Sequence, residues 1–496
     1  MRKHCTIVCR RNNHMSKSSW NHSGKNRWNK RQAPKAAWKS VDDVTGSKKH
    51  IVSNAGVAIV GNMLDKVDMN SFNTLESETS HPSNEVPLSD VVISEIATMC
   101  CGDPSYEGTR EFYQDTDFYP GALHVPRILS PERTRQRIEI AAATPEAYAE
   151  CHKTVNSINL QLLKGEELTQ ELGYLPVDID VSPFDESKSN KENVSMTYKK
   201  TMGYAPNFLY VGKEGFMLAT EFRPGSQHCQ KGTPEFLKGA ISSVREIFPG
   251  GRVLFRMDSG NDAMENYGVL LDGGMYFICK RNLRKESVYA WLDHAKTYTL
   301  KENIDHPREG KTVYIGSTWL DRKYKDASGV DRDVTLRVVY EITERTMDHD
   351  GQMLMPPDVE VNMFTTNTDL TDKQVIEMYH NHGTCEQYHS ELKTDLDFEK
   401  VPSGKYLVNS FLNDIAMLAF NVLRCVGMRL FDLHKVPKRG YAFRRRITTV
   451  VQHMMHIPAM VIDHSHKRSL DLGSTNPWAE AFIYVFNFYK DCQLVS

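Results

Sequence analysis

Acidic residues at the ends of predicted strands are the residues of this sequence best suited to chemistry. Asp178 and Asp180 lie in a short apolar strand predicted over residues 174–181, and Asp258 follows a second one over 252–257. In a mixed sheet flanked by helices the strand ends line a crevice, so these carboxylates can meet there. Carboxylate oxygens suit hard divalent cations. The expected chemistry is therefore metal-dependent.

A third carboxylate would come from a helix predicted over residues 372–395, which offers Glu386 and Glu391. Three convergent carboxylates are the minimum set for a two-metal site, in which ions about 3.5–4 Å apart activate the attacking oxygen and stabilise the leaving one in phosphoryl transfer. Taken alone, an acid at a strand end is more often a solvated loop residue. Whether these acids are metal ligands or solvated loop residues therefore depends on the surrounding sequence.

The elements that must position these acids follow one another in an informative order. Three hairpin-linked strands are followed by helix, strand, helix and strand, which predicts a mixed α/β sheet flanked by helices. The predicted strands cover residues 174–181, 203–212, 215–223, 252–257 and 275–279, and the helices cover 233–247 and 261–271.

The remainder of the chain divides by pattern into helical and β-rich parts. Residues 51–165 are predicted to be helical. Ser130 and Pro131 are expected to open an exposed helix that carries Arg133, Arg135 and Arg137. Residues 285–365 are predicted to be β-rich. Long helices are expected over 372–395, 404–432, 443–463 and 477–490.

Charge is distributed unevenly along a chain whose formal net charge is only −2. Residues 1–49 hold thirteen Lys and Arg against two Asp, a local charge of +11. Residues 51–120 hold two basic and twelve acidic residues, a local charge of −10. The basic arm, with its interleaved tryptophans, is typical of a phosphate-binding tail. A solvated tail lying on its acidic neighbour is the alternative.

Composition indicates an ordinary globular protein. About 40% of the residues are hydrophobic and 25% are charged, which argues against wholesale disorder. The ten cysteines are mostly scattered singly and predict no disulfide framework. We find neither a run of about 18 apolar residues nor the apolar core of a secretory signal. We therefore expect no membrane partner and a cytoplasmic, nucleoid-associated protein.

Four sequence blocks together resemble the DDE transposases of bacterial insertion sequences, and most closely the group named after insertion sequence thirteen-eighty. Three of the blocks are Val177–Asp185, Glu221–His228 and Arg256–Asp262. The fourth is a helix with Tyr379, His382, Glu386 and Lys393, similar to the family signature of Tyr, two residues, Arg, three residues, Glu, six residues and Lys. His382 stands where the family usually has Arg.

The resemblance implies a fold and a mechanism. The implied fold is a ribonuclease H-like mixed-sheet core with a β-rich insertion, an N-terminal helical domain and a C-terminal helical region. The implied catalytic and metal-binding residues are Asp180, Asp258 and Glu386, with Asp178 as the alternative first acid. Two Mg²⁺ ions, with Mn²⁺ as a substitute, would promote attack by water at the transposon end. The freed 3′-hydroxyl would then attack target DNA.

The implied partner is double-stranded DNA, as transposon terminal inverted repeats and as target, held by a homodimer. Candidate DNA contacts are Tyr379, His382, Lys393, Arg284, Arg133 and Arg137. The expected domains are a basic flexible arm (1–49), a helical DNA-binding domain (50–168), the first part of the core (169–284), the insertion (285–366), the glutamate helix (367–400) and a C-terminal helical region (401–496).

Two other functions stay open at this point. One is a nuclease with the same core that cuts DNA without joining it. The other is a catalytically silent DNA-binding protein derived from a transposase. A test of strand joining would separate the first from a transposase, and a test of cleavage would separate the second.

Overall fold

The computed structural model describes residues 48–75, 86–431, 443–465 and 467–491, together with 41, 43–46 and 433. By their contacts, the described residues from His50 onward form one compact unit. Most of the predicted basic arm lies outside the described residues, and the rest of the description concerns this unit.

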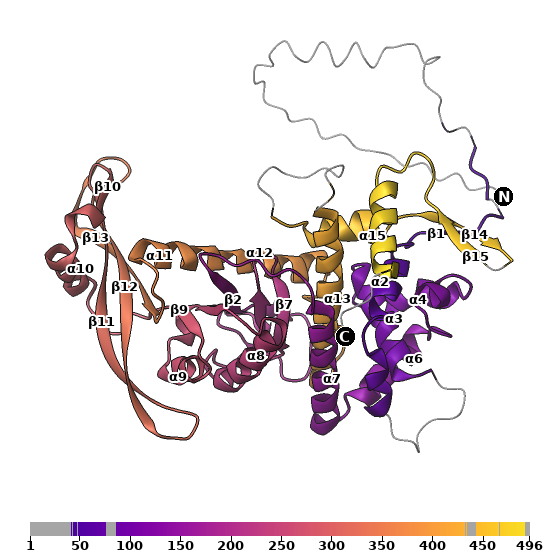
Figure 1. Ribbon diagram of the computed structural model, residues 1–496, viewed down its shortest axis with the longest axis horizontal. Coiled ribbons are helices and arrows are strands. Elements are labelled where there is room, and N and C mark those ends of the chain that lie inside the picture. The colour runs from indigo at the N-terminus through magenta and orange to yellow at the C-terminus, as the bar shows by residue number, and fades with distance from the viewer. Residues whose placement is uncertain are drawn as a thin grey trace, which may run out of the picture. The chain divides into compact units, whose positions relative to one another are not determined.

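One large mixed sheet carries the predicted catalytic strands (Figure 1). β2 (Tyr174–Val181) lies between β8 (Arg252–Met257), with which it runs parallel, and the antiparallel β6 (Asn207–Val211). Beyond β8 lies β9 (Tyr276–Lys280), parallel to it, and beyond β6 lies β7 (Phe216–Glu221), antiparallel to β6. β2, β6 and β8 are apolar and almost wholly buried, as strands covered on both faces must be.

The β-rich insertion extends the same sheet. β10 (Ile304–Arg308), β11 (Lys311–Lys325), β12 (Asp331–Met347) and β13 (Met353–Thr366) form an antiparallel series. The end of β13 pairs with β9 through Phe364–Thr366, so one continuous sheet of nine strands extends from the insertion through the core. The insertion also contains α10 (Val288–Tyr298), which packs on these strands, and a 3₁₀ turn (Lys301–Asn303).

Helices α8 (Thr233–Ile247) and α9 (Met264–Asp272) provide the crossovers that parallel strands require. α8 leads from β7 toward β8, and α9 leads from β8 to β9. A second small sheet of β3 (Phe184–Asp185), β5 (Met202–Tyr204) and β4 (Ser195–Met196) follows β2. The strand predicted over residues 203–212 is thus two strands, separated at Ala205 and Pro206.

The N-terminal helices share their core with the C-terminal part of the chain. α3 (Leu88–Cys100) and α7 (Pro145–Leu163) both pack on the long α13 (Tyr406–Phe431), most of whose 26 residues are buried. The N-terminal elements are β1 (Ile51–Val52), α2 (Val57–Leu64), a 3₁₀ helix (Met69–Leu75), α3 (Leu88–Cys100), a 3₁₀ turn (Tyr106–Gly108), α4 (Thr109–Gln114), α5 (Tyr119–Ala122), α6 (Pro131–Ala141) and α7 (Pro145–Leu163). Regions 50–168 and 401–496 therefore fold around one hydrophobic core.

Helix α13 (Tyr406–Phe431) is, among the described residues, the one helix long and apolar enough to cross a membrane. In the apolar window, 94% of the residues are buried inside the protein, so α13 is built as a core helix. Its Asn421 covers the edge of the sheet, because its side-chain amide accepts from the Met217 N–H at 2.8 Å and donates to the Met217 carbonyl at 2.7 Å.

The helix expected over residues 443–463 is wrong in its second half. A short helical segment, α14 (Ile447–Val450) with a π turn (Val451–Met455), ends before Pro458. β14 (Ala459–His464) then pairs with β15 (Lys467–Asp471) and β1, and α15 (Ala479–Asp491) follows. Proline cannot donate a helical hydrogen bond and restricts the residue before it, so the chain extends there.

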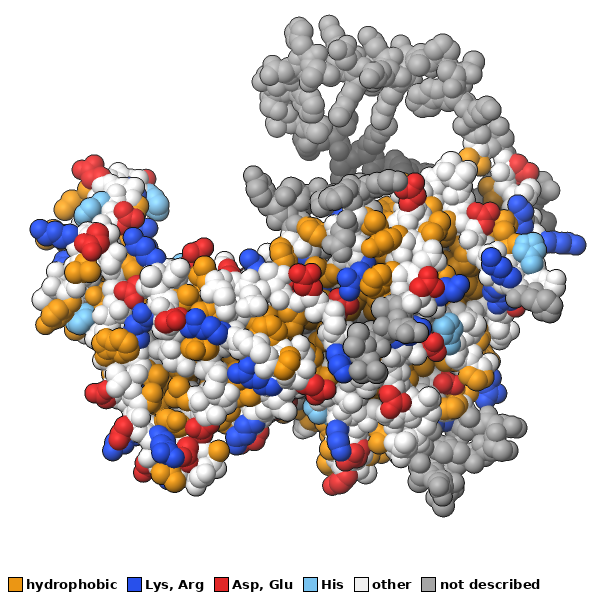
Figure 2. Space-filling model, viewed as in Figure 1, with side chains coloured by type: hydrophobic (Ala, Val, Ile, Leu, Met, Phe, Trp, Pro, Cys, Tyr) orange, Lys and Arg blue, Asp and Glu red, His pale blue; other side chains and the backbone are white. Residues whose placement is uncertain are grey.

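Charged side chains of both signs are interspersed on the face seen in Figure 2, and no patch of a single sign covers it. Net charge on this face therefore does not locate a DNA-binding surface, and specific side chains have to be considered one at a time.

Candidate active site

Asp180 and Asp258 lie at the ends of neighbouring parallel strands. Ile179 of β2 pairs with Met257 of β8, so the next residue on each strand is one of these aspartates. Burial and the charge of Asp180 raise the pKa of Asp258 above its usual value. Two carboxylates that oppose each other's ionisation form a set of hard oxygen donors that a divalent cation would neutralise.

Asp180 is held by a histidine from the helix predicted over residues 372–395. The Nε2 atom of His389 lies 3.1 Å from Oδ2 of Asp180, and the backbone N–H of Val181 donates to Oδ1 at 2.8 Å. Burial opposes ionisation of Asp180, but the hydrogen bond and the charge of His389 outweigh it, so the pKa lies below its usual value. The side chain remains 27% exposed and accessible to a ligand.

Asp178 lies on the same strand but has no free side. Arg256 donates to both of its carboxylate oxygens at 2.6 Å, and His382 Nδ1 lies 2.9 Å from Oδ1. Burial opposes ionisation here as well, but Arg256 and His382 keep the pKa of Asp178 below its usual value. Arg256 also donates to the carbonyl of Met378, so this buried cluster joins β2 and β8 to the helix of the third acid.

Asp178, His382 and Cys385 are three potential metal ligands whose donor atoms lie within 4.8 Å of one another. Burial and the nearby Asp178 charge raise the pKa of the Cys385 thiol well above its usual value, which keeps it protonated. Arg256 already neutralises Asp178. A thiol is a poor metal ligand and a metal ion would be repelled by the guanidinium, so the cluster does not fit a metal.

The predicted helix over residues 372–395 is a composite of several turns. α11 (Asp372–His380) is followed by a 3₁₀ segment (Asn381–Thr384), α12 (Cys385–Ser390) and a π turn (Glu391–Asp395). Thr371 and Gln374 form a capping box at its start, which fixes where the helix begins.

Glu386 and Glu391 have opposite environments on this helix. Glu386 is exposed and forms no hydrogen bond or ion pair with any residue in the described ranges. It lies four residues after His382 and three before His389, and both histidines reach the aspartates of β2; residues at these spacings are neighbours on a helix surface. Glu391 is buried, and it pairs with Arg424 at 2.7 Å and with Arg444.

The hairpin of β6 and β7 packs against the same helix. Gly215 in its turn has a φ of +70°, and a Cβ there would lie 2.3 Å from the ring of Tyr388. Tyr388 donates to the carbonyl of Lys213 at 3.1 Å. A residue without a side chain is thus required for the turn to approach α12 this closely.

A family model supplies the observation that decides the identity of the chain. The model described as transposase DDE domain group 1 matches residues 39–492, which is most of the sequence. The chain belongs to the DDE transposase family.

A solved structure described as the cryo-EM structure of piggyBac transposase synaptic complex with hairpin DNA is similar to this transposase. The TM-score is 0.40 and the identity 9%, over 83% of this chain and 82% of that chain. No match is found among curated protein sequences. DDE transposases are DNA-cleaving and DNA-transferring enzymes that use divalent metal ions, and this is the activity of the present chain.

Four of the predicted DNA contacts of the transposase lie on its composite helix or beside the core. Tyr379 is half-buried against Phe364, with ring centroids 4.7 Å apart, and His382 is buried against Asp178. Lys393 lies in the π turn, donates to the carbonyl of Pro183 at 2.6 Å and pairs with Glu399 at 2.9 Å. Arg284 is 66% exposed.

The other two predicted contacts lie on α6 of the transposase. Arg133 is exposed and donates to Gln136 at 2.9 Å. The expectation that the arginines lie along one exposed helix is wrong for Arg137, which is buried and donates to the carbonyl of Val86 at 2.8 Å. A buried guanidinium that satisfies a backbone carbonyl stabilises the helical region from within.

Sequence reasoning missed the two residues that hold the aspartates, His389 and Arg256. His389 lies three residues after Glu386 and seven after His382, so helical periodicity alone places the three on one side of the transposase helix. Arg256 lies two residues before Asp258 and therefore faces the same side of β8. Periodicity could have found both residues, although not their partners.

Proposed function

We propose that this transposase cuts DNA at the ends of a mobile element and joins the freed 3′-hydroxyl to target DNA, with Asp180, Asp258 and Glu386 as its catalytic carboxylates. The single observation that carries the proposal is the adjacency of Asp180 and Asp258 at the ends of the parallel strands β2 and β8.

The choice of acids rests on which carboxylates are free. Asp178 and Glu391 are each bonded to buried arginines, Asp178 to Arg256 and Glu391 to Arg424. Asp180 keeps an exposed side, and Glu386 has no partner among the described residues. A carboxylate already neutralised by a guanidinium has little left to offer a metal ion, so we assign the catalytic role to the free members of each pair.

The proposed core is ribonuclease H-like, and the proposed group is that of insertion sequence thirteen-eighty. In support of the core, the antiparallel hairpin of β6 and β7 lies on one side of β2, and β8 and β9, which run parallel to β2, lie on the other. In support of the group, the chain carries the spaced Tyr379, Glu386 and Lys393 of its signature.

The proposed metal ions are two Mg²⁺, with Mn²⁺ as a substitute. The donor set fits them, because it consists of carboxylate oxygens. Burial and the charge of Asp180 raise the pKa of Asp258, and a bound cation would offset that repulsion. When bound, the ions would lower the pKa of the attacking water and stabilise charge on the leaving oxygen.

The residues of the chain would prepare the site for this step. His389 fixes the carboxylate of Asp180, and Asn261 donates to Oδ1 of Asp258 at 3.0 Å. The cluster of Asp178, Arg256 and His382 holds the helix of Glu386 against both strands. Orientation of ligands before substrate binds lowers the barrier, because less reorganisation remains for the reaction itself.

The proposed partner is double-stranded DNA, namely the terminal inverted repeats of the element and its target. A homodimer would hold two ends at once, and a cytoplasmic, nucleoid-associated protein would meet its substrate directly. The basic residues 1–49 would add affinity through release of counterions, which makes binding sensitive to salt.

The test is cleavage of a labelled duplex that carries the terminal repeat, with Mg²⁺ and with EDTA. We expect cleavage with Mg²⁺ and its loss in Asp180→Asn, Asp258→Asn and Glu386→Gln. Glu377→Gln, an exposed acid on α11, is the matched control and should cleave normally. Cleavage without joining would indicate a nuclease. Binding without cleavage under any metal would indicate a catalytically silent DNA-binding protein, and either result would overturn the proposal.

A further inference from the structure

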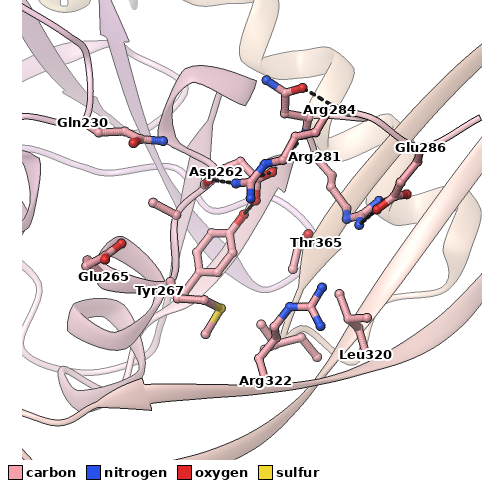
Figure 3. A pocket seen from close by; sticks show the side chains of 14 residues that line it. Gln230, Asp262, Glu265, Tyr267, Arg281, Arg284, Glu286, Leu320, Arg322 and Thr365 are labelled. Atoms are coloured by element: carbon pink, nitrogen blue, oxygen red, sulfur yellow. Dashed lines mark hydrogen bonds and ion pairs between the residues drawn. The ribbon is translucent and has the colours of Figure 1, made fainter.

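A hollow of about 320 Å³ lies where the core meets the insertion (Figure 3). Its core side is built from the start of α9 and the segment after β9, and its other side from β11, β12 and β13. Asp262, which lines it, follows Asp258 by only four residues. The hollow is therefore close to the proposed catalytic carboxylates along the chain but is formed by different side chains.

Two acids of the hollow are fully engaged. Asp262 accepts from the hydroxyl of Tyr267 at 2.8 Å and from the backbone N–H of Asn282 at 3.0 Å. Glu286 accepts from Arg281 at 2.8 and 2.5 Å and from the indole of Trp291 at 2.8 Å. Glu286 therefore pairs with Arg281, whereas Arg284 keeps one ion-pair contact with Asp262, at 3.7 Å, and Arg322 forms no ion pair within the described ranges. The third acid, Glu265, is exposed.

Two arginines reach the hollow from opposite sides with donors to spare. Arg284, on the core side, donates to the carbonyl of Asp262 at 2.9 Å and lies 3.7 Å from its carboxylate. Arg322, on β11, donates to the carbonyl of Asp321 at 3.0 Å and forms no ion pair within the described ranges. Each guanidinium has five N–H groups, so most of these donors are unused.

The remaining wall is apolar. Leu320 and Leu336 come from β11 and β12, and Met264 comes from α9. Spare guanidinium donors beside an apolar surface match a phosphodiester and its attached deoxyribose, because an arginine fork binds two phosphate oxygens at once. A neutral ligand would leave both arginines unsatisfied.

We propose that this hollow binds one backbone phosphate of the DNA strand that is cut, a few nucleotides from the scissile phosphate, through Arg284 and Arg322. The insertion would thereby hold the strand in register with Asp258. This inference rests on the proposed function, since it needs a DNA strand at the carboxylates, and it adds a separate contact that sets where along the strand the cut falls.

The test replaces the terminal-repeat phosphates one at a time with uncharged methylphosphonates and measures duplex affinity in EDTA, where no cleavage occurs. For the wild-type protein we expect one phosphate near the cut whose replacement weakens binding of the duplex roughly 10-fold. This is the size of effect expected when a pair of charge-assisted hydrogen bonds is lost. In Arg322→Gln and in Arg284→Gln, affinity should fall by a similar factor, with little further loss at that position.

Lys323→Gln is the matched control, because Lys323 adjoins Arg322 on β11, is 77% exposed and faces the other side of the strand. Any loss of affinity in Lys323→Gln should be the same for every duplex, whichever phosphate is replaced. The extra loss at the one position near the cut should remain as in the wild-type protein. An unchanged interference profile in both arginine variants would overturn the inference. Affinity is measured without metal, so this test does not depend on cleavage. If one phosphate near the cut proved important for binding but the protein never cleaved DNA, the contact would stand and the proposed function would be rejected.

Discussion

The Nε2 atom of His389 lies 3.1 Å from Oδ2 of Asp180, so the helix that carries Glu386 is bonded directly to the strand that carries the first aspartate. On its other nitrogen His389 meets the hydroxyl of Tyr210 at 3.2 Å. The ring is therefore fixed at both ends, and it sets the orientation of a carboxylate that we propose as a metal ligand.

Loss of this contact should weaken metal binding more than it weakens the fold. We expect His389→Ala to raise the Mg²⁺ concentration for half-maximal cleavage roughly 10-fold or more, as is usual when a residue orienting a metal ligand is removed. His389→Gln, which can still donate one hydrogen bond, should recover part of the loss. His380→Ala, an exposed histidine on α11, serves as the control. Equal metal dependence in all variants would contradict this role.

Asp178 and Asp180 should respond differently to the same substitution. Asp178→Asn removes the charge that pairs with buried Arg256, and it should lower the free energy of unfolding by roughly 3 kcal/mol. Asp180→Asn relieves repulsion with Asp258 but loses the charge that His389 stabilises, so it should lower the stability of the metal-free protein far less than Asp178→Asn does, while cleavage is lost. Urea unfolding of both variants, measured in EDTA, checks this. A stable, inactive Asp178→Asn would reverse the assignment of the first acid.

The two glutamates of the composite helix offer a second matched pair. Glu391→Gln leaves Arg424 buried without its carboxylate, and it should cost about 3–5 kcal/mol of stability. Glu386→Gln changes an exposed side chain and should alter stability by about 0.5 kcal/mol or less. Thermal unfolding beside a cleavage assay separates the two effects. If Glu386→Gln cleaved DNA normally, Glu386 would not be the third carboxylate.

Glu95 on α3 should make the stability of the protein fall as pH rises. It is fully buried, neither carboxylate oxygen has a hydrogen-bond partner, and burial together with the charge of Asp103 raises its pKa to about 8. The folded state therefore holds a proton between the ordinary pKa of 4.5 and about 8 that the unfolded state has lost. Stability should decline across that window, by up to about 1.4 kcal/mol per pH unit.

Glu95→Gln removes this titration and should flatten the pH dependence while stabilising the protein at pH 8. Urea unfolding from pH 5 to 9 on both proteins tests the expectation. A wild-type stability that stays level or rises through this range, with the same profile in Glu95→Gln, would show that Glu95 is solvated or paired.

Much of the core could be read from the sequence because its strands are continuous apolar runs. The bounds of β2, β8 and α8 were predicted to the residue. Such runs are buried on both faces of a parallel sheet, so their length equals the length of the apolar pattern. The predicted residues Asp180 and Asp258 also proved to be adjacent, since strand order brings strand ends together.

What could not be read depends on partners far along the chain. His389 and Asp180 are 209 residues apart, and Arg137 finds its carbonyl 51 residues away at Val86. A local pattern shows the side of a helix on which a residue lies but not what covers it. The π turn that contains Lys393 is a local departure from regular spacing that a repeat of 3.6 residues does not reveal.

The nine-stranded sheet has two edge strands, β7 and β10, and neither is well suited to pair with a further strand. At β7 the amide of Asn421 occupies both hydrogen-bonding groups of Met217. At the far end β10 is short, contains Pro307 and departs from regular register between Asp305 and Arg308. Copies of this protein crowded along one DNA molecule therefore have little tendency to join their sheets into aggregates, and any assembly on DNA has to use other surfaces.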